Sequence, residues 1–329
     1  MRETTVAIVG AGAVGGFVGA QLARAGVPVS ALARGATAAA LKAHGFRLDM
    51  AGERRVAAVR VAESAAALGP HDVVVIAVKA QSLPALAPSL GPLLGPDTVV
   101  LTAMNGVPWW FFHGLPGAPT LRLESVDPGG AIAAALPPAR VIGGVVHISC
   151  ATPEPGLVRH GIGTRIIVGE PDGSDSPRVA ALAAMLRDGG IDAPVSRQIQ
   201  TDVWYKLWGN MTMNPVSALT GATSDRILDD PLVNGFCLAV MREASAIGAR
   251  IGCPIAQSGE ERNKITRQLG AMRTSMLQDL EAGKPLELDA LVAVVREIGL
   301  AVGVPTPSID ALLGLARLHA RVRGLYPAA

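Results

Sequence analysis

Several residue types are scarce in this chain of 329 residues, and each shortage excludes a class of protein. The three cysteines, Cys150, Cys237 and Cys253, form no C-x-x-C pair and leave an odd count, which argues against a disulfide-stapled secreted domain. Lysine and arginine form no cluster and the net charge is only +2, so neither nucleic acid nor a membrane surface is an expected partner. Glycine, proline or charge interrupts every apolar run before it could span a bilayer. Since "TVAIVG" near the N-terminus reads as a strand rather than a targeting segment, we expect a reduced cytoplasmic protein.

Histidine supplies neither a metal site nor a catalytic triad in this sequence. The six histidines show none of the short spacings of metal-ligand motifs, and no serine, histidine and aspartate stand in an order typical of a hydrolase. We therefore expect no bound metal. The histidines stand at positions 44, 71, 113, 147, 160 and 319.

The first part of the chain alternates short apolar runs with helix-like segments. The runs are almost continuously apolar, as strands covered on both faces must be, and the alternation favours a parallel, doubly wound α/β sheet. We also expect a hairpin within 46–61, turning at 51–53, and a second β-rich stretch over 141–169. The apolar runs are "TVAIVG" (5–10), "PVSALAR" (28–34), "DVVVIAVK" (72–79) and "TVVLTAM" (98–104).

From about residue 201 the pattern is helical almost to the end of the chain. Apolar residues recur at helical spacing over 232–252 and 287–303. We place the boundary near 190–200 and expect two domains, 1–195 and 196–329. The predicted fold class is α/β, a Rossmann-type doubly wound sheet followed by an all-helical C-terminal domain.

A glycine-rich loop follows the first apolar run. "GAGAVGG" places Gly10, Gly12 and Gly15 in the pattern G-x-G-x-x-G between a predicted strand and a predicted helix. The first glycine permits a tight turn, the second lets the backbone approach a pyrophosphate, and the third lets the helix pack closely on the strand. Glycine-rich chains produce this motif by chance, but its position at the first strand–helix turn predicts a dinucleotide-binding site.

The residue after the second strand indicates which dinucleotide binds. Sites that prefer NAD, and FAD sites of this fold, place an acid there to accept a hydrogen bond from the ribose. This chain has no acidic residue between Glu3 and Asp49, and Arg34 stands at the expected position. A planar guanidinium suits a 2′-phosphate, although a solvated loop arginine is the simpler alternative. We predict NADP.

Two further polar positions follow predicted strands. Lys79 ends the strand 72–79, and Asn105-Gly106 lies just after 98–104. Because the carboxyl ends of strands in such sheets face the ligand crevice, we expect both in the cofactor site. The alternatives are a surface residue at a helix start for Lys79 and a simple turn for Asn105-Gly106.

The stretch "YKLWGNMTMN" (205–214) places three polar residues on one side of an otherwise apolar helix. Lys206, Asn210 and Asn214 stand four residues apart, at a helical period of 3.6 residues. A solvated face would normally use glutamate, arginine and several lysines, and asparagine is a mediocre helix former. The stripe is therefore either merely exposed or built to meet a ligand. Pro215 lacks an N–H, so we expect the helix to kink or end there.

These motifs together resemble the ketopantoate reductase (2-dehydropantoate 2-reductase) family over nearly the whole chain. The resemblance implies NADPH-dependent reduction of a 2-keto acid, with Lys206 as proton donor and Glu287 as a supporting acid. It implies substrate contacts from Asn210, Asn214 and Ser275, phosphate contacts from Arg34 and Lys79, and Asn105 beside the nicotinamide. The segments that carry it are "GAGAVGG", "VKAQ" (78–81), "NG" (105–106), "KLWGNMTMNP" (206–215) and "SMLQDLEAGKPLELD" (275–289).

The chemistry of the residues agrees with these roles. Hydride arriving at a ketone carbon leaves an alkoxide, which needs an acidic or positive partner. A lysine in an apolar cleft has its pKa lowered by desolvation, so it gives up a proton more readily near neutral pH. Asparagine offers a donor and an acceptor without charge. The alternatives are structural: Glu287 would lie in a first helical turn begun by Pro285, and Ser275 would be a helix cap.

Two departures from the family pattern leave the substrate open. The family often has asparagine ten residues after the second stripe asparagine and three before the serine, where this chain has Ser224 and Met272. "WWFF" (109–112) follows Asn105-Gly106 directly and is either core packing or a bulky wall of the pocket. Three functions remain: a ketopantoate reductase, a paralogous NADPH-dependent reductase of another 2-keto or 3-hydroxy acid, and a non-catalytic NADP-binding regulator. The expected partner is a small 2-keto acid, and a homodimer is compatible with the apolar helical domain.

Overall fold

The computed structural model describes residues 3–328, and the chain divides into two compact units. The first comprises Met1–Leu115 and Asp127–Asp202, and the second comprises Pro116–Val126 and Val203–Ala329. The division falls inside one helix, α7 (Ile199–Thr220). The functional ranges 1–195 and 196–329 stay a prediction, because compactness does not say which residues bind cofactor or substrate.

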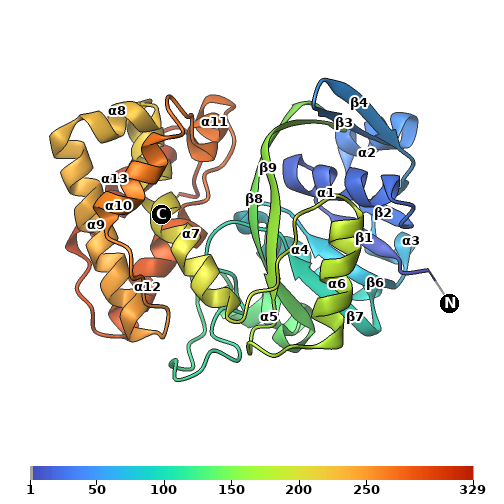
Figure 1. Cartoon of the computed structure of the whole chain (residues 1–329), viewed down its shortest axis with the longest axis horizontal. Helices are drawn as coiled ribbons and strands as arrows, with labels where there is room; N and C mark the ends of the chain where they lie inside the picture. Colours follow the sequence, from blue (N-terminus) through green and yellow to red (C-terminus); the bar gives the residue numbers. More distant parts are fainter. Residues whose placement is uncertain (1–2, 329) are drawn as a thin grey trace. The chain divides into compact units, whose positions relative to one another are not determined.

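The first unit is a mixed sheet with helices between its strands (Figure 1). Its strands and α-helices are β1 (Val6–Val9), α1 (Ala13–Arg24), β2 (Val29–Leu32), α2 (Gly35–His44), β3 (Phe46–Met50), β4 (Glu53–Ala57), β5 (Arg60–Ala62), α3 (Ala65–Leu68), β6 (His71–Ile76), α4 (Leu83–Leu86), β7 (Leu94–Thr102), α5 (Ala131–Ala135), β8 (Val141–Glu154), β9 (Leu157–Gly169) and α6 (Pro177–Asp188).

Within residues 3–328 the strands form one nine-stranded sheet in the order β4-β3-β9-β8-β7-β6-β1-β2-β5. Strands β5, β2, β1, β6, β7 and β8 are parallel neighbours, which confirms the doubly wound part. Two antiparallel pairs, β8–β9 and β3–β4, extend it into a mixed sheet. The predicted hairpin is confirmed as β3–β4, and the β-rich stretch 141–169 as β8–β9.

Burial explains why the central strands read as continuous apolar runs. Every residue of β1 and β2 is buried, since the strands are covered on both faces. Helix α1 contributes Phe17 and Leu22 to the same core, and α6 adds Leu182 and Leu186. The helix–sheet contact is close: a side chain on Gly19 of α1 would lie 2.4 Å from the ring of Phe46.

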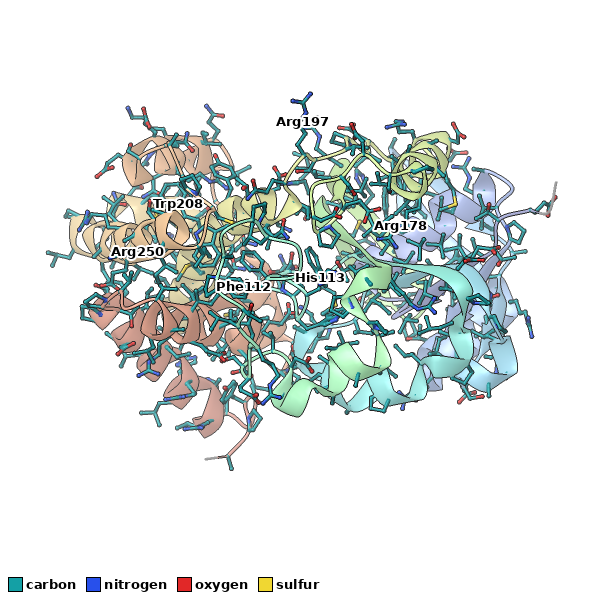
Figure 2. The ribbon with its side chains drawn as sticks, turned by 90° about the horizontal axis from the view of Figure 1, so that it is seen from below. Phe112, His113, Arg178, Arg197, Trp208 and Arg250 are labelled. Atoms are coloured by element: carbon teal, nitrogen blue, oxygen red, sulfur yellow. The ribbon has the colours of Figure 1, made fainter. Side chains whose placement is uncertain are left out.

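The second unit consists of helices (Figure 1). Helix α7 packs on α9 through two tryptophans, whose indole N–H groups donate to backbone oxygens: Trp204 to Ala244 at 3.2 Å and Trp208 to Met241 at 2.7 Å. Figure 2 shows Trp208 among these helices. The elements after α7 are α8 (Ser224–Asp229), α9 (Pro231–Arg250), α10 (Gly259–Arg267), α11 (Ser275–Glu281), the π-helical turn η6 (Asp289–Ala293), α12 (Val294–Ala301) and α13 (Pro307–Val322).

Helix α9 is long and apolar enough to cross a membrane by length and composition, a test that core helices of soluble proteins also pass. One third of its most apolar window is buried inside the protein. Two of the residues that it buries, Val240 and Met241, are less than 2% exposed. Packing within the second unit therefore accounts for part of its apolar character.

Of the two outcomes expected at Pro215, an end of the helix is wrong, because α7 runs on to Thr220 with the proline inside it; a kink there stays a prediction. An internal proline costs about 3 kcal/mol through the lost N–H and a steric clash. Residues on both sides of it are buried, including Met213 and Val216. Tertiary packing of both halves of α7 offsets the local penalty.

Candidate active site

The glycine loop of the first unit joins β1 to α1, and its three glycines have different surroundings. A Cβ on Gly10, whose φ is +92°, would lie 2.7 Å from Val78 Cγ1, and one on Gly15 would lie 2.1 Å from the Gly10 carbonyl oxygen. A Cβ on Gly12 would meet no atom within 4 Å. The first and third glycines are therefore needed for internal packing. The second faces open space, as close approach of a pyrophosphate requires.

The loop lies where the strand order reverses. Strand β1 pairs in parallel with β2 on one side and β6 on the other, with Val9 opposite both Leu32 and Ile76. The contact of Gly10 with 77–78 brings the segment after β6 against the glycine loop. Lys79 follows directly and is exposed. It lies beyond the end of β6 rather than in the strand, and precedes a single 3₁₀ turn, Ala80–Ser82.

Arg34 lies just after β2 at the N-cap position of α2 and is exposed. The first turn of α2 contains no acidic residue. An acid does stand at the end of the neighbouring strand: Glu63 follows β5, whose Ala62 is the register partner of Leu32. Lys42 holds the Glu63 carboxylate at 3.2 Å, in an exposed pair. The carboxylate at the end of the neighbouring strand is therefore paired with a lysine.

Asn105 follows β7 by a short segment and is half-buried. Gly106, with φ +86°, makes the following bend in the left-handed region that favours glycine. The turn interpretation of the Asn-Gly pair is thus correct for its backbone. A role for the Asn105 side chain beside a nicotinamide stays a prediction.

The "WWFF" cluster is mainly core packing. Trp109, Trp110 and Phe111 are at most 8% exposed, and the Trp109 indole donates to the Leu136 carbonyl oxygen at 3.1 Å. Trp110 packs over Gly143, where a side chain would lie 2.4 Å from its ring. Phe112 is half-buried and packs edge-on against Phe111, with ring centroids 5.3 Å apart. Figure 2 shows Phe112 beside His113 on this loop.

In the second unit, α7 carries the polar stripe. Lys206 and Asn210 are half-buried, and Asn214 is buried at 6% exposure. The residues between them, Leu207 and Met211, are buried. Apolar packing thus fixes the rotation of α7 about its axis and leaves Lys206 and Asn210 on the more open side.

Burial lowers the pKa of Lys206 to about 8, while the negative charge of Glu287 acts in the opposite direction and raises it. Glu287 is itself buried, at 7% exposure. A lysine with this pKa is mostly protonated at neutral pH and loses its proton far more readily than a solvated lysine. The pair supplies a proton donor whose charge is balanced by a carboxylate.

The expected position of Glu287 in a first helical turn begun by Pro285 is wrong. Residues 284–287 are not helical, and the following helix starts with the π-helical turn Asp289–Ala293. The Leu286 N–H donates to the Leu325 carbonyl oxygen at 3.0 Å, so a segment distant in the sequence holds the backbone next to Glu287. Glu287 is held by a long-range contact, which no local pattern indicates.

Ser275 is the first residue of α11 and is exposed. Thr274 caps the helix instead, because its hydroxyl accepts from the Leu277 N–H at 3.2 Å. The helix-cap alternative for Ser275 is therefore wrong. Its proposed contact with substrate stays a prediction.

The two departures from the family pattern are neighbours in the structure. The Ser224 N–H donates to the Met272 carbonyl oxygen at 3.0 Å, and the Ser224 hydroxyl donates to the Gly270 carbonyl oxygen at 2.8 Å. Ser224 is fully buried and Met272 half-buried. The two positions at which this chain lacks the family's asparagines therefore lie next to each other in the second unit.

Sequence reasoning missed Arg262 of α10. Its guanidinium lies over the ring of Tyr205, with Cζ 5.4 Å from the ring centroid, and approaches Gly209 of α7. Tyr205 and Gly209 directly precede Lys206 and Asn210, so a second cation stands beside the stripe. Gly209 was the available signal, since glycine inside a helix often marks close approach of another group.

Two family models match this chain. The model described as "Ketopantoate reductase PanE/ApbA" matches residues 6–173, and that described as "Ketopantoate reductase PanE/ApbA C terminal" matches 198–320. A curated 2-dehydropantoate 2-reductase from Mesorhizobium japonicum is 47% identical over 98% of this chain and 99% of its own length.

This chain also resembles solved structures over nearly its whole length. That of a candidate ketopantoate reductase from Ralstonia solanacearum has a TM-score of 0.95 and 61% identity, covering 99% of this chain and 100% of that one. D-mandelate dehydrogenase, solved with NADH and anilino(oxo)acetate, has a TM-score of 0.83 at 20% identity, covering 98% and 100%, which shows a shared fold alone. The likeness extends over the sheet and the helices.

Proposed function

Because the chain belongs to the ketopantoate reductase family, we propose that it reduces 2-dehydropantoate to pantoate, with NADPH as reductant and Lys206 as general acid. The observation that carries this proposal is the interaction of half-buried Lys206, on the same helix face as Asn210 and Asn214, with the buried carboxylate of Glu287, at a lysine whose pKa is lowered to about 8. A reductase that must protonate an alkoxide at neutral pH needs such a group.

NADPH, when bound, supplies the hydride. The residues that would hold it are Gly10, Gly12 and Gly15 at the pyrophosphate, with Arg34 and Lys79 at the phosphates and Asn105 near the nicotinamide. The open space at Gly12 and the acid-free first turn of α2 after Arg34 support this assignment. Residues 1–195 would then be the NADP-binding domain and 196–329 the substrate domain.

The side chains of the second unit would carry the remaining chemistry. The Lys206 ammonium donates its proton to the keto oxygen as negative charge develops there, and the Glu287 carboxylate keeps that ammonium protonated. Asn210, Asn214 and Ser275 would orient the substrate through its hydroxyl and carboxylate. We further propose that the protein is cytoplasmic, since the three cysteines form no disulfide, and that it is a homodimer, in keeping with the exposed apolar side chains of the helical unit.

Two alternatives are less well supported. A paralogue with a bulkier substrate was suggested by "WWFF", but three of those four side chains are buried in the core of the first unit. The altered pair at Ser224 and Met272 is the observation that still favours a different keto acid. A non-catalytic regulator would have no use for a lysine of lowered pKa that interacts with a buried glutamate.

A substrate panel tests the proposal. We expect ketopantoate to give the highest kcat/KM for NADPH oxidation among ketopantoate, 2-ketoisovalerate, pyruvate, 2-ketoglutarate and oxaloacetate, measured by NADPH absorbance. 2-Ketoisovalerate lacks the hydroxyl, and a polar group left unpaired in a dry site costs about 1–3 kcal/mol, or roughly 5–150-fold in rate. An aromatic keto acid that outran ketopantoate severalfold would establish the paralogue, and cofactor binding without turnover would favour the regulator.

The pH dependence of the reaction should report the Lys206 pKa. The protonated lysine is the donor in reduction, so kcat/KM should be flat below about pH 8 and fall above it. In the reverse direction the neutral amine is the acceptor, so the rate of pantoate oxidation should rise through the same pH range.

The variant Glu287→Gln should move the alkaline limb to lower pH, because removal of the carboxylate charge removes the influence that raises the lysine pKa. Glu260→Gln, at an exposed glutamate in the first turn of α10, is the matched control and should leave the limb in place. A limb that stayed unchanged in Glu287→Gln would show that another group controls the titration.

A further inference from the structure

Helix α13 of the second unit is apolar on two opposite faces. One face packs into the unit, with Ile309, Leu312, Leu313, Ala316 and Ala320 at most 4% exposed. The residues of the opposite face occur at steps of four, three and four, which keeps them on one side of a helix. They are Ala311, which is exposed, Leu315 and Leu318, each 61% exposed, and Val322, 76% exposed.

This face differs from ordinary surface apolar residues, which are scattered singly. The described chain exposes ten large hydrophobic side chains, and three of them lie on this one side of α13. These three side chains form one apolar strip along the helix, the kind of exposed surface that marks a protein–protein contact.

The spacing of the exposed face is symmetric in sequence. Steps of four, three and four read the same in both directions, with the midpoint between Leu315 and Leu318. Two copies of α13 packed antiparallel about a two-fold axis at that midpoint would place Leu315 against Leu318 of the other copy, and the small Ala311 against its Val322. An isologous interface requires such self-complementarity.

The charges of α13 favour the same arrangement. Its first turn carries Asp310 and its last turn carries His319 and Arg321. Antiparallel packing brings Asp310 towards Arg321 of the second copy and sets the opposed ends of the two helix dipoles side by side. Parallel packing would bring basic ends together. Asp310 also pairs with Arg296 of its own chain at 2.9 Å but keeps 47% of its side-chain surface exposed.

We propose that α13 is the centre of a two-fold homodimer interface, packed antiparallel on α13 of a second copy through Ala311, Leu315, Leu318 and Val322. The proposal specifies the surface of the dimer and is independent of the substrate and of the catalytic residues.

Light scattering and sedimentation of the full chain test the interface. The wild-type protein should have twice the chain mass of 33.7 kDa at micromolar concentration. Leu318→Glu should raise the dimer dissociation constant at least roughly 30-fold, the effect of losing an interface hot spot, and Leu315→Glu/Leu318→Glu should be monomeric. Leu232→Glu, at an 84% exposed leucine of α9, is the matched control and should remain dimeric. A monomeric wild type, or a dimer that survives the double substitution, would overturn the proposal.

Cysteine cross-linking tests the antiparallel register. Ala311→Cys/Val322→Cys should form a covalent dimer under mild oxidation, whereas Val322→Cys alone should not. In the antiparallel pair the two copies of position 322 lie roughly 16 Å apart along the helix axis, too far for a disulfide. The wild-type chain, with its three native cysteines, gives the background. Efficient cross-linking by Val322→Cys alone, or none by the double variant, would contradict the arrangement.

Discussion

Lys206→Ala is expected to lower kcat for keto-acid reduction by roughly 10²–10⁴-fold, the usual contribution of a general acid. The dissociation constant of NADPH should stay unchanged, because the residues assigned to the cofactor belong to the first unit and Lys206 to the second. Stopped-flow or steady-state NADPH absorbance gives kcat, and fluorescence titration gives the cofactor affinity.

Two control variants separate loss of the acid from general damage. Asn210→Ala removes a neighbour on the same stripe and should raise KM more than it lowers kcat, as loss of a binding contact does. Lys264→Ala removes an exposed lysine of α10 and should change neither constant beyond about twofold, since surface substitutions away from special contacts alter free energies by about 0.5 kcal/mol or less. Full activity in Lys206→Ala would show that another group donates the proton.

Arg34→Asp should weaken NADPH binding by one or more orders of magnitude and remove the preference over NADH. Charge-assisted hydrogen bonds to a phosphate contribute about 1.5–3 kcal/mol, which corresponds to roughly 10–150-fold in the dissociation constant. The substituted carboxylate would also repel the 2′-phosphate, while it could accept from the ribose hydroxyl of NADH. Fluorescence titration with both cofactors measures the change.

Arg24→Asp is the matched control for this substitution. Arg24 is exposed and ends α1, roughly 18 Å along the helix from the glycine loop at 1.5 Å per residue. The same change of charge in the same unit should therefore leave the ratio of the two dissociation constants close to that of the wild type. Equal affinities for NADPH and NADH in the wild type, or no loss in Arg34→Asp, would refute the assignment of Arg34 to the 2′-phosphate.

The sequence by itself determined the features that depend on residues close together in the chain. The glycine spacing at 10, 12 and 15 predicted a tight strand–helix turn, and the segment 46–61 predicted a hairpin turning at 51–53; both occur. The four-residue period of Lys206, Asn210 and Asn214 placed the three on one side of a helix. Periodicity and turn chemistry are local properties, so a single sequence contains them in full.

The tertiary structure alone decided the features that join distant segments. The bond from Leu286 to Leu325 fixes the backbone next to Glu287, and packing on both sides of Pro215 continues α7 beyond it. The sequence left open whether the "WWFF" side chains form a pocket wall or pack in the core, and their burial shows that three of the four pack in the core. The pKa of Lys206 is lowered by burial and raised by a carboxylate 81 positions away in the chain, and the first effect is the larger. Such effects arise from contacts between residues remote in sequence, whose pairing no local pattern specifies.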